Sequence, residues 1–144
     1  MPAMMKATMV LVFGAGVLVG GMLTPFGTAR AQNSQRVFEL RTYTAPEGKL
    51  SALQARFRDH TRRIFEKHGM TSIGYWVPED APQSQNTLIY ILAHPSREAA
   101  KKNWAEFSAD PEWQKVSEES QRDGRIVTKV ESTFMVPTDF SAIK

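Results

Sequence analysis

Hydrophobic and polar positions in residues 37–69 follow two periods in succession. The first residues alternate, so a strand here would present two sets of side chains on opposite faces. The apolar set is Phe38, Leu40 and Thr42, and the polar set is Glu39, Arg41 and Tyr43. Glu39 and Arg41 are neighbours on the polar face, so the pattern predicts an ion pair between them. We interpret this pair as solvated or at an interface rather than as the wall of a pocket, because structural ion pairs outnumber sites.

A turn and an amphipathic helix are predicted after this strand. Pro46 fixes φ and Gly48 permits a positive φ, so the chain can reverse there. The start of the helix stays open between Ala45 and Gly48. Beyond the turn, side chains of the inward stripe recur every three or four positions: Leu50, Leu53, Phe57, His60, Ile64 and His68. The spacing therefore predicts that His60 faces inward, and Gly69 is placed to end the helix.

Three further strands are predicted, at residues 71–77, 87–93 and 126–136. In the first of them Ile73, Tyr75 and Val77 share one face, and Ser72, Gly74 and Trp76 share the other. The second contains Tyr90 and is apolar on both faces, which is typical of a central strand. The third alternates over its whole length, and Phe140 in the short tail that follows is expected to dock on the domain.

A second helical region lies between the last two strands. Ser96 is a suitable N-cap for its first helix, and Trp104 falls on the buried stripe of that helix. Asp110 and Pro111 then predict a restart, with the acid as cap and proline at the first helical position.

The resulting order, β-α-β-β-α-β, is typical of an α+β ferredoxin-like fold with one antiparallel sheet and helices on one of its faces. The uncovered face carries isoleucine, tyrosine or tryptophan on several strands, and such a face needs a partner. We therefore expect a homodimer in which two sheets stack into a dimeric α/β-barrel.

Residues 1–31 have the pattern of an export signal rather than of a domain. The start is weakly positive, residues 7–23 are uncharged and mostly small or apolar, and Ala29 and Ala31 supply a small-x-small cleavage pattern. We expect an exported, periplasmic protein whose mature domain is residues 32–144. The apolar run is short for a spanning helix, which needs ~20 residues. The alternative is an uncleaved anchor that holds the protein at the membrane.

Composition excludes several function classes. The formal charge of +3 includes Lys6 and Arg30 of the predicted signal, so the domain is nearly neutral and no nucleic acid partner is expected. The chain has no cysteine, and its three histidines lack the spacing of metal motifs. It also has no glycine-rich phosphate loop and no nucleophile elbow. We expect neither a metal nor any other cofactor.

Several short motifs in this chain resemble those of the NIPSNAP family. They are ELRTY at 39–43, PEGK at 46–49, FRDH at 57–60, NWAEF at 103–107, DPEW at 110–113 and FMVPT at 134–138. The resemblance covers about residues 37–140, and Glu47 is a small departure within its turn. It implies the dimeric α/β-barrel fold, whose other members include cofactor-independent monooxygenases, haem-degrading enzymes and small isomerases. The family itself has no general reaction, so the resemblance implies no particular chemistry.

The candidate site residues are one histidine and four aromatic side chains. His60 is the candidate general base, because the pKa of imidazole lies near neutrality. Tyr43, Trp76, Tyr90 and Trp104 are expected to line a pocket for a small molecule between sheet and helices. Two interpretations stay open: a periplasmic enzyme or binder of a small, aromatic molecule, and a non-catalytic dimeric interaction module.

Overall fold

The computed structural model describes residues 35–144, so the predicted export signal lies outside the described residues. The elements, in chain order, are β1 Val37–Thr44, α1 Leu50–Arg56, the π-helical turn η1 Phe57–Thr61, α2 Arg62–Lys67, β2 Thr71–Trp76, the 3₁₀ turn η2 Gln83–Gln85, β3 Thr87–His94, α3 Arg97–Ala109, α4 Pro111–Ser120 and β4 Lys129–Met135. Within this part of the chain, no helix is both long enough and apolar enough to cross a bilayer.

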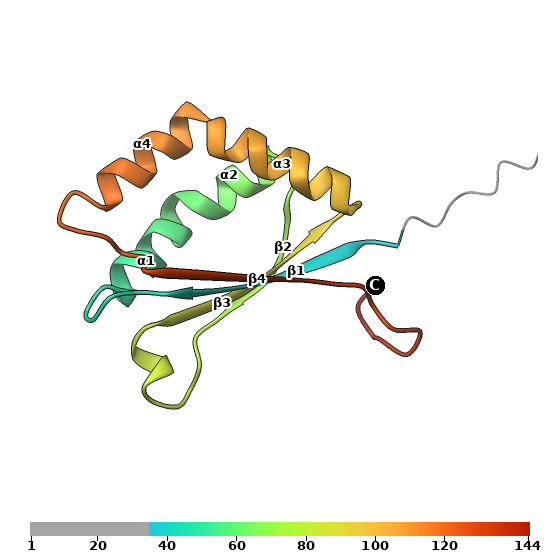
Figure 1. The fold of residues 1–144 in the computed structure, drawn as a ribbon, viewed down its shortest axis with the longest axis horizontal. Helices are drawn as coiled ribbons and strands as arrows, with labels where there is room; N and C mark the ends of the chain where they lie inside the picture. Colours follow the sequence, from blue (N-terminus) through green and yellow to red (C-terminus); the bar gives the residue numbers. More distant parts are fainter. Residues whose placement is uncertain (1–34) are drawn as a thin grey trace, which may run out of the picture. The chain divides into compact units, whose positions relative to one another are not determined.

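The four strands form one antiparallel sheet in the order β2-β3-β1-β4. All the helices lie on one face of that sheet (Figure 1). The predicted α+β ferredoxin-like fold is thus confirmed. The register aligns a polar row across the helix-facing side, because Tyr90 is paired with Tyr75 and Arg41, and Arg41 in turn with Ser132.

The polar face of β1, rather than its apolar face, lies under the helices. The guanidinium of Arg41 donates to the carboxylate of Glu39 across 2.7 Å, and the two side chains are only 16% and 1% exposed. The predicted ion pair therefore forms, but its interpretation as a solvated or interface pair is wrong. Trp104 of α3 covers the pair from the helix side. A strand pattern alone defines two faces and does not say which one the helices will cover.

A π-helical turn interrupts the first helix and changes which residues face inward. Phe57–Thr61 holds one residue more than a regular turn, so the positions after Phe57 are rotated. Thr61 becomes buried and its hydroxyl donates to the carbonyl of Arg56 across 3.2 Å. His60 becomes exposed on the outer side. The prediction that His60 faces inward is therefore wrong, because it assumed an unbroken helical period.

The helix ends follow the expected capping chemistry. Ser96 accepts a hydrogen bond from the N–H of Ala99 at 3.0 Å, which confirms it as the N-cap of α3. Asp110 caps α4 through the N–H of Glu112 at 2.8 Å, with proline at the first position. Gly69, with φ of 73°, ends the first helical segment as predicted.

A bulge in β2 places Ile73 and Tyr75 on opposite faces. The pairing with β3 skips from Ser72 to Gly74, which leaves Ile73 as the surplus residue. Ser72 and Tyr75 then share the helix side, where their hydroxyls are 2.7 Å apart. Ile73 lies on the other face beside Ile91. The prediction that Ile73 and Tyr75 share a face is wrong, because a bulge breaks the two-residue period.

The core between sheet and helices is largely aromatic. Its rings pack mostly edge to face, with centroids 4.5 to 6.3 Å apart. Tyr90 on the central strand β3 is fully buried and contacts rings from β1, β2 and the first helix. The sequence-based assignment of β3 as a central strand is confirmed.

The opposite face of the sheet carries an apolar groove of about 320 Å³ near the C-terminus. Its lining from the strands is Phe38, Ile73, Ile91 and Met135. Ile143 of the tail also lines it, whereas Phe140 is 85% exposed. The tail thus docks, but not through Phe140 as expected.

Candidate functional site

The structure brings three of the five candidate site residues together. Tyr43, Tyr90 and Trp104 lie between the sheet and the helices, where Tyr43 and Tyr90 have ring centroids 5.3 Å apart. Trp76 is half exposed, and its ring lies on the other side of β2, over Gly74. His60 is on the outer side of the first helix. The expected single pocket with all five residues does not form.

Glu39 is the centre of a buried polar network that links three strands and α3. Its carboxylate accepts hydrogen bonds from Arg41 and Ser132 at 2.7 Å, and from the indole Nε1 of Trp104 at 2.7 Å. The Nε2 atom of His94, which is fully buried at the end of β3, lies 3.0 Å away. Each of the two carboxylate oxygens of Glu39 thus has two polar partners: Arg41 and Ser132 contact Oε1, and Trp104 and His94 contact Oε2.

The electrostatics of Glu39 make it a positioning group rather than a general base. Burial raises the pKa of its carboxyl, but hydrogen bonds from His94, Trp104, Ser132 and Arg41 outweigh burial and lower the pKa to about 2. A carboxylate of that pKa is a weak base at neutral pH. What it does is hold Arg41 against the face of Trp104, with the guanidinium carbon 4.1 Å from the ring centroid.

Sequence reasoning missed His94 and Ser132 as members of this network. His94 lies just before a proline, which is typical of a strand end, yet it is the last residue of β3 and is fully buried. Alternation puts Ser132 on the same face of β4 as Val130 and Phe134. Only the strand register, which pairs Ser132 with Arg41, brings it to Glu39.

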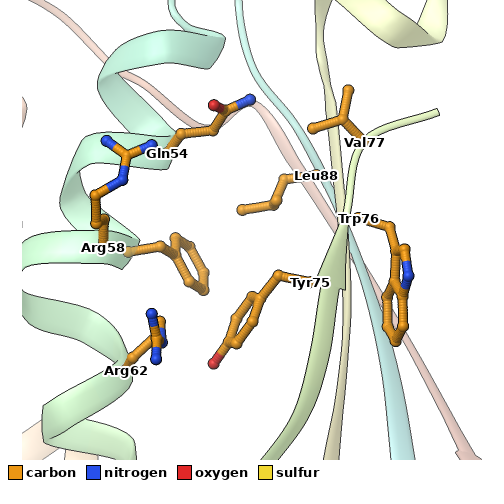
Figure 2. A pocket seen from close by; sticks show the side chains of 8 residues that line it. Gln54, Arg58, Arg62, Tyr75, Trp76, Val77 and Leu88 are labelled. Atoms are coloured by element: carbon orange, nitrogen blue, oxygen red, sulfur yellow. The ribbon is translucent and has the colours of Figure 1, made fainter. Parts of the chain in front are cut away.

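A cleft of about 250 Å³ lies between the sheet and the first helix beside β2, and we call it the β2 cleft (Figure 2). Three long polar side chains of the first helix, Gln54, Arg58 and Arg62, stand opposite strand residues. The apolar and aromatic lining comes from Phe57, Tyr75, Trp76, Val77 and Leu88. Figure 2 shows Tyr75 and Leu88 pointing toward the helix and the Trp76 ring pointing away from it.

The β2 cleft has a fixed aromatic floor and a cationic rim. The hydroxyl of Tyr75 is held by Ser72, and its ring packs on Phe57 with centroids 5.7 Å apart. The guanidinium of Arg62 lies 5.8 Å from the centroid of the Tyr75 ring. Neither Arg62 nor Arg58 forms an ion pair with any carboxylate in residues 35–144.

The described residues hold no cluster of potential metal ligands. Among residues 35–144, no three histidine, aspartate or glutamate side chains come close enough together to hold a metal ion. The two closest His–carboxylate contacts, His68 with Asp110 at 2.6 Å and His94 with Glu39 at 3.0 Å, lie in separate networks.

The sheet order, the single layer of helices and the cleft between them define an α+β protein of the ferredoxin-like class. Comparison with known protein families identifies its family. The profile of the NIPSNAP family matches residues 38–142, which is most of the chain, so this chain belongs to the NIPSNAP family. The resemblance of the motifs to that family is thereby confirmed.

Solved structures agree with this assignment. A NIPSNAP family protein with unknown function from Agrobacterium tumefaciens is 26% identical, with a TM-score of 0.67 over 78% of this chain and 96% of that one. A NIPSNAP-like domain protein from Burkholderia xenovorans is 18% identical, with a TM-score of 0.65 over 75% and 90%. A cofactor-independent oxygenase from Streptomyces nogalater, SnoaB, reaches 0.50 at 11% identity over 75% and 98%, which shows the fold alone. Comparison with curated proteins gave no match.

Proposed function

We propose that this NIPSNAP-family protein binds a small, planar, aromatic anion in the β2 cleft. The observation that carries the proposal is the combination of a rigid aromatic floor with two guanidinium groups that have no carboxylate partner among the described residues. A cleft of about 250 Å³ is large enough for a ligand with one aromatic ring or two fused rings.

The floor supports recognition of a planar ring. Phe57 and Leu88 line the cleft and are almost fully buried, so they are held in place by the core beneath it. Tyr75 is oriented by Ser72 and stacks on Tyr90 with centroids 5.5 Å apart, so binding orders its ring at a reduced entropic cost. Offset or edge-to-face contacts with such rings contribute about 0.5–1.5 kcal/mol beyond area burial.

The rim supports a negative charge on the ligand. Arg58 and Arg62 are one turn apart on the helix face that borders the cleft, and both are exposed. A guanidinium matches a carboxylate in a bidentate geometry, so a ring-bound carboxylate can reach either side chain. Gln54, one turn before Arg58, adds an amide that can donate or accept.

Binding of benzoate tests the proposal, with isothermal titration and NMR on the full chain. Benzoate should bind more tightly than benzyl alcohol, which lacks the charge, and than acetate, which lacks the ring. Arg62→Gln and Tyr75→Leu should each weaken benzoate binding about tenfold, a change of 1.4 kcal/mol. Arg63→Gln is the matched control, because Arg63 lies next to Arg62 but pairs with Glu112 of α4. Equal binding of benzoate and acetate would contradict the proposal.

A separate observation favours a non-catalytic interaction module as the second candidate. Phe65 and Tyr90 are at most 1% exposed, so the middle of the core is filled. Ile73 and Ile91, on the opposite face, line an apolar groove that a second copy of the chain would cover. Failure of every aromatic probe together with a tight dimer in native mass spectrometry would favour this candidate. A small molecule retained through purification would favour the first.

We further propose that the protein is exported and acts as a homodimer through the sheet face away from the helices. The support is the small-x-small pattern at Ala29 and Ala31 for export, and the apolar character of that sheet face for dimerisation.

A further inference from the structure

Arg56 is a buried cation without an anion. The residue is only 6% exposed, and no carboxylate in residues 35–144 pairs with it. Its guanidinium makes one long hydrogen bond, to the hydroxyl of Ser120 at 3.4 Å, and lies 5.1 Å from the centroid of the Trp113 ring. Its Nε has no partner among the described residues.

The surroundings of Arg56 do not neutralise it. Burial lowers the pKa of its guanidinium, and the groups that act against this lowering are the phenols of Tyr43 and Tyr90 rather than carboxylates. The other guanidinium of this region, Arg41, is already neutralised by Glu39. The layer therefore carries one positive charge in excess, and buried charges in proteins are normally paired.

Arg56 lines a groove between the first helix and α4, with a volume of about 340 Å³. The groove has apolar walls formed by Ala52, Ala55 and Val116. Ser120 lies beside Arg56 and donates its hydroxyl proton to the carbonyl of Ser117 across 3.1 Å, so the guanidinium is the group that the inner end offers to a ligand.

The rim of the same groove is acidic. Asp59, one turn after Arg56, forms no hydrogen bond or ion pair with a side chain of residues 35–144 and is exposed. Glu119 has only a loose contact with Arg122, at 3.6 Å. His60 is the third titratable group on the rim. A simple anion would gain from Arg56 but would meet repulsion from two carboxylates on its way.

We propose that this groove, the α1–α4 groove, binds a small zwitterion of the α-amino acid type. The carboxylate of the ligand pairs with the guanidinium of Arg56. Its ammonium group lies at the rim beside Asp59 and Glu119. A zwitterion supplies the missing negative charge at the inner end and satisfies the rim carboxylates at the same time, with a short apolar side chain against the alanine and valine walls.

The α1–α4 groove is separate from the β2 cleft. The two lining sets share no residue, and Phe57, which packs on the sheet, stands between Arg56 and Arg58 in the sequence. The inference therefore goes beyond the proposed aromatic-anion site, and either one can fail without the other.

NMR titration of the isotope-labelled full chain tests the proposal with three matched probes. L-alanine carries both charges, propionate lacks the ammonium group, and ethylamine lacks the carboxylate. The methyl signals of Ala52, Ala55 and Val116 and the Nε–H signal of Arg56 are the readouts. L-alanine should shift these signals saturably and bind at least about tenfold more tightly than either half-probe. Equal binding of propionate, or no saturable shift with L-alanine, would overturn the proposal.

Variants separate the two ends of the ligand. Arg56→Met keeps the apolar stem and should abolish L-alanine binding, whereas Arg125→Met, at an exposed arginine away from the groove, should leave it unchanged. Asp59→Asn should weaken L-alanine binding and strengthen propionate binding. Because Asp59 is exposed, that variant keeps the test valid even if Arg56→Met does not fold. An unchanged L-alanine affinity in Asp59→Asn would contradict the placement of the ammonium group.

Discussion

The indole Nε1 of Trp104 donates a hydrogen bond to the carboxylate of Glu39 across 2.7 Å, which ties α3 to the central part of the sheet. The same carboxylate holds Arg41, whose guanidinium carbon lies over the Trp104 ring, 4.1 Å from its centroid. Glu39, Arg41 and Trp104 thus contact one another pairwise, and each side chain restrains the other two.

Removing the charge of Glu39 should strongly destabilise the fold. Glu39→Gln keeps the shape of the side chain but leaves the guanidinium of Arg41 buried without a counterion, so we expect a loss of about 3–5 kcal/mol. Trp104→Phe removes only one hydrogen bond and some ring area, with an expected loss of about 1–2 kcal/mol. Urea unfolding at pH 7 measures both changes. A Glu39→Gln protein as stable as wild type would show that the network contributes nothing to folding.

Stability should fall with acid through the same group. The pKa of Glu39 is lowered from 4.5 to about 2 in the fold, so the unfolded chain takes up the proton first. The contribution is complete above about pH 5 and is lost as the pH falls toward 2, with a total on the order of 3 kcal/mol. Hydrogen bonds from Lys67 and His68 hold the pKa of Asp110 below its usual range too, and this part should remain in Glu39→Gln. Urea midpoints across this range should therefore show a smaller slope for the variant.

Substitutions at two adjacent residues of the π-helical turn should change the stability by very different amounts. Thr61→Val removes the hydroxyl that satisfies the carbonyl of Arg56, so we expect a loss of about 1–2 kcal/mol. His60→Ala changes an exposed side chain and should stay within about 0.5 kcal/mol of wild type. Thermal and urea unfolding of the two variants measure both changes in stability. A larger effect at His60 than at Thr61 would mean that the turn is regular helix in solution.

The homodimer prediction can be tested on the sheet face away from the helices. Light scattering at micromolar concentration should give twice the chain mass. Ile91→Lys places a charge in the centre of that face and should give a folded monomer. Lys102→Ala, on the exposed side of α3, is the control and should remain dimeric. A wild-type monomer that binds no hydrophobic dye would contradict the need for a partner.

Export can be tested directly at the N-terminus. Ala29 and Ala31 supply the two small side chains that a signal peptidase requires, so cleavage is expected between Ala31 and Gln32. N-terminal sequencing of the protein from the periplasmic fraction should begin at Gln32. A product that starts at Met1 and stays with the membrane would establish the anchor instead.

The order of the elements and the helix caps were predictable from sequence because they depend on local chemistry. Ser96 and Asp110 cap the helices they precede, and the alternation of residues 37–43 makes a strand whatever lies above it. Which face of that strand is buried depends on partners far away in the chain. The burial of Glu39 requires donors from α3, β3 and β4, and no spacing within the strand encodes them.

The predicted pocket was only partly right for a similar reason. Tyr43 and Tyr90 face the helices and Trp104 of α3 faces the sheet, because regular periods hold where they lie. The errors concern single surplus residues, one in the first helix and one in β2. Both surpluses shift every later side chain of their element, and a sequence alone does not show where a surplus residue is accommodated.

The π-helical turn also bears on how members of this family are compared. A π turn arises when one residue is added to an α-helix without breaking it. A relative that lacks the added residue would have a helix that is one residue shorter. Its inward-facing stripe would then continue unbroken through the position of His60. Alignments that force such a pair into register would match an inward side chain of one protein with an outward one of the other. A gap placed within Phe57–Thr61 would again align inward-facing residues with inward-facing residues. Equivalent positions of this helix are therefore better assigned by superposing structures than by aligning sequences without gaps.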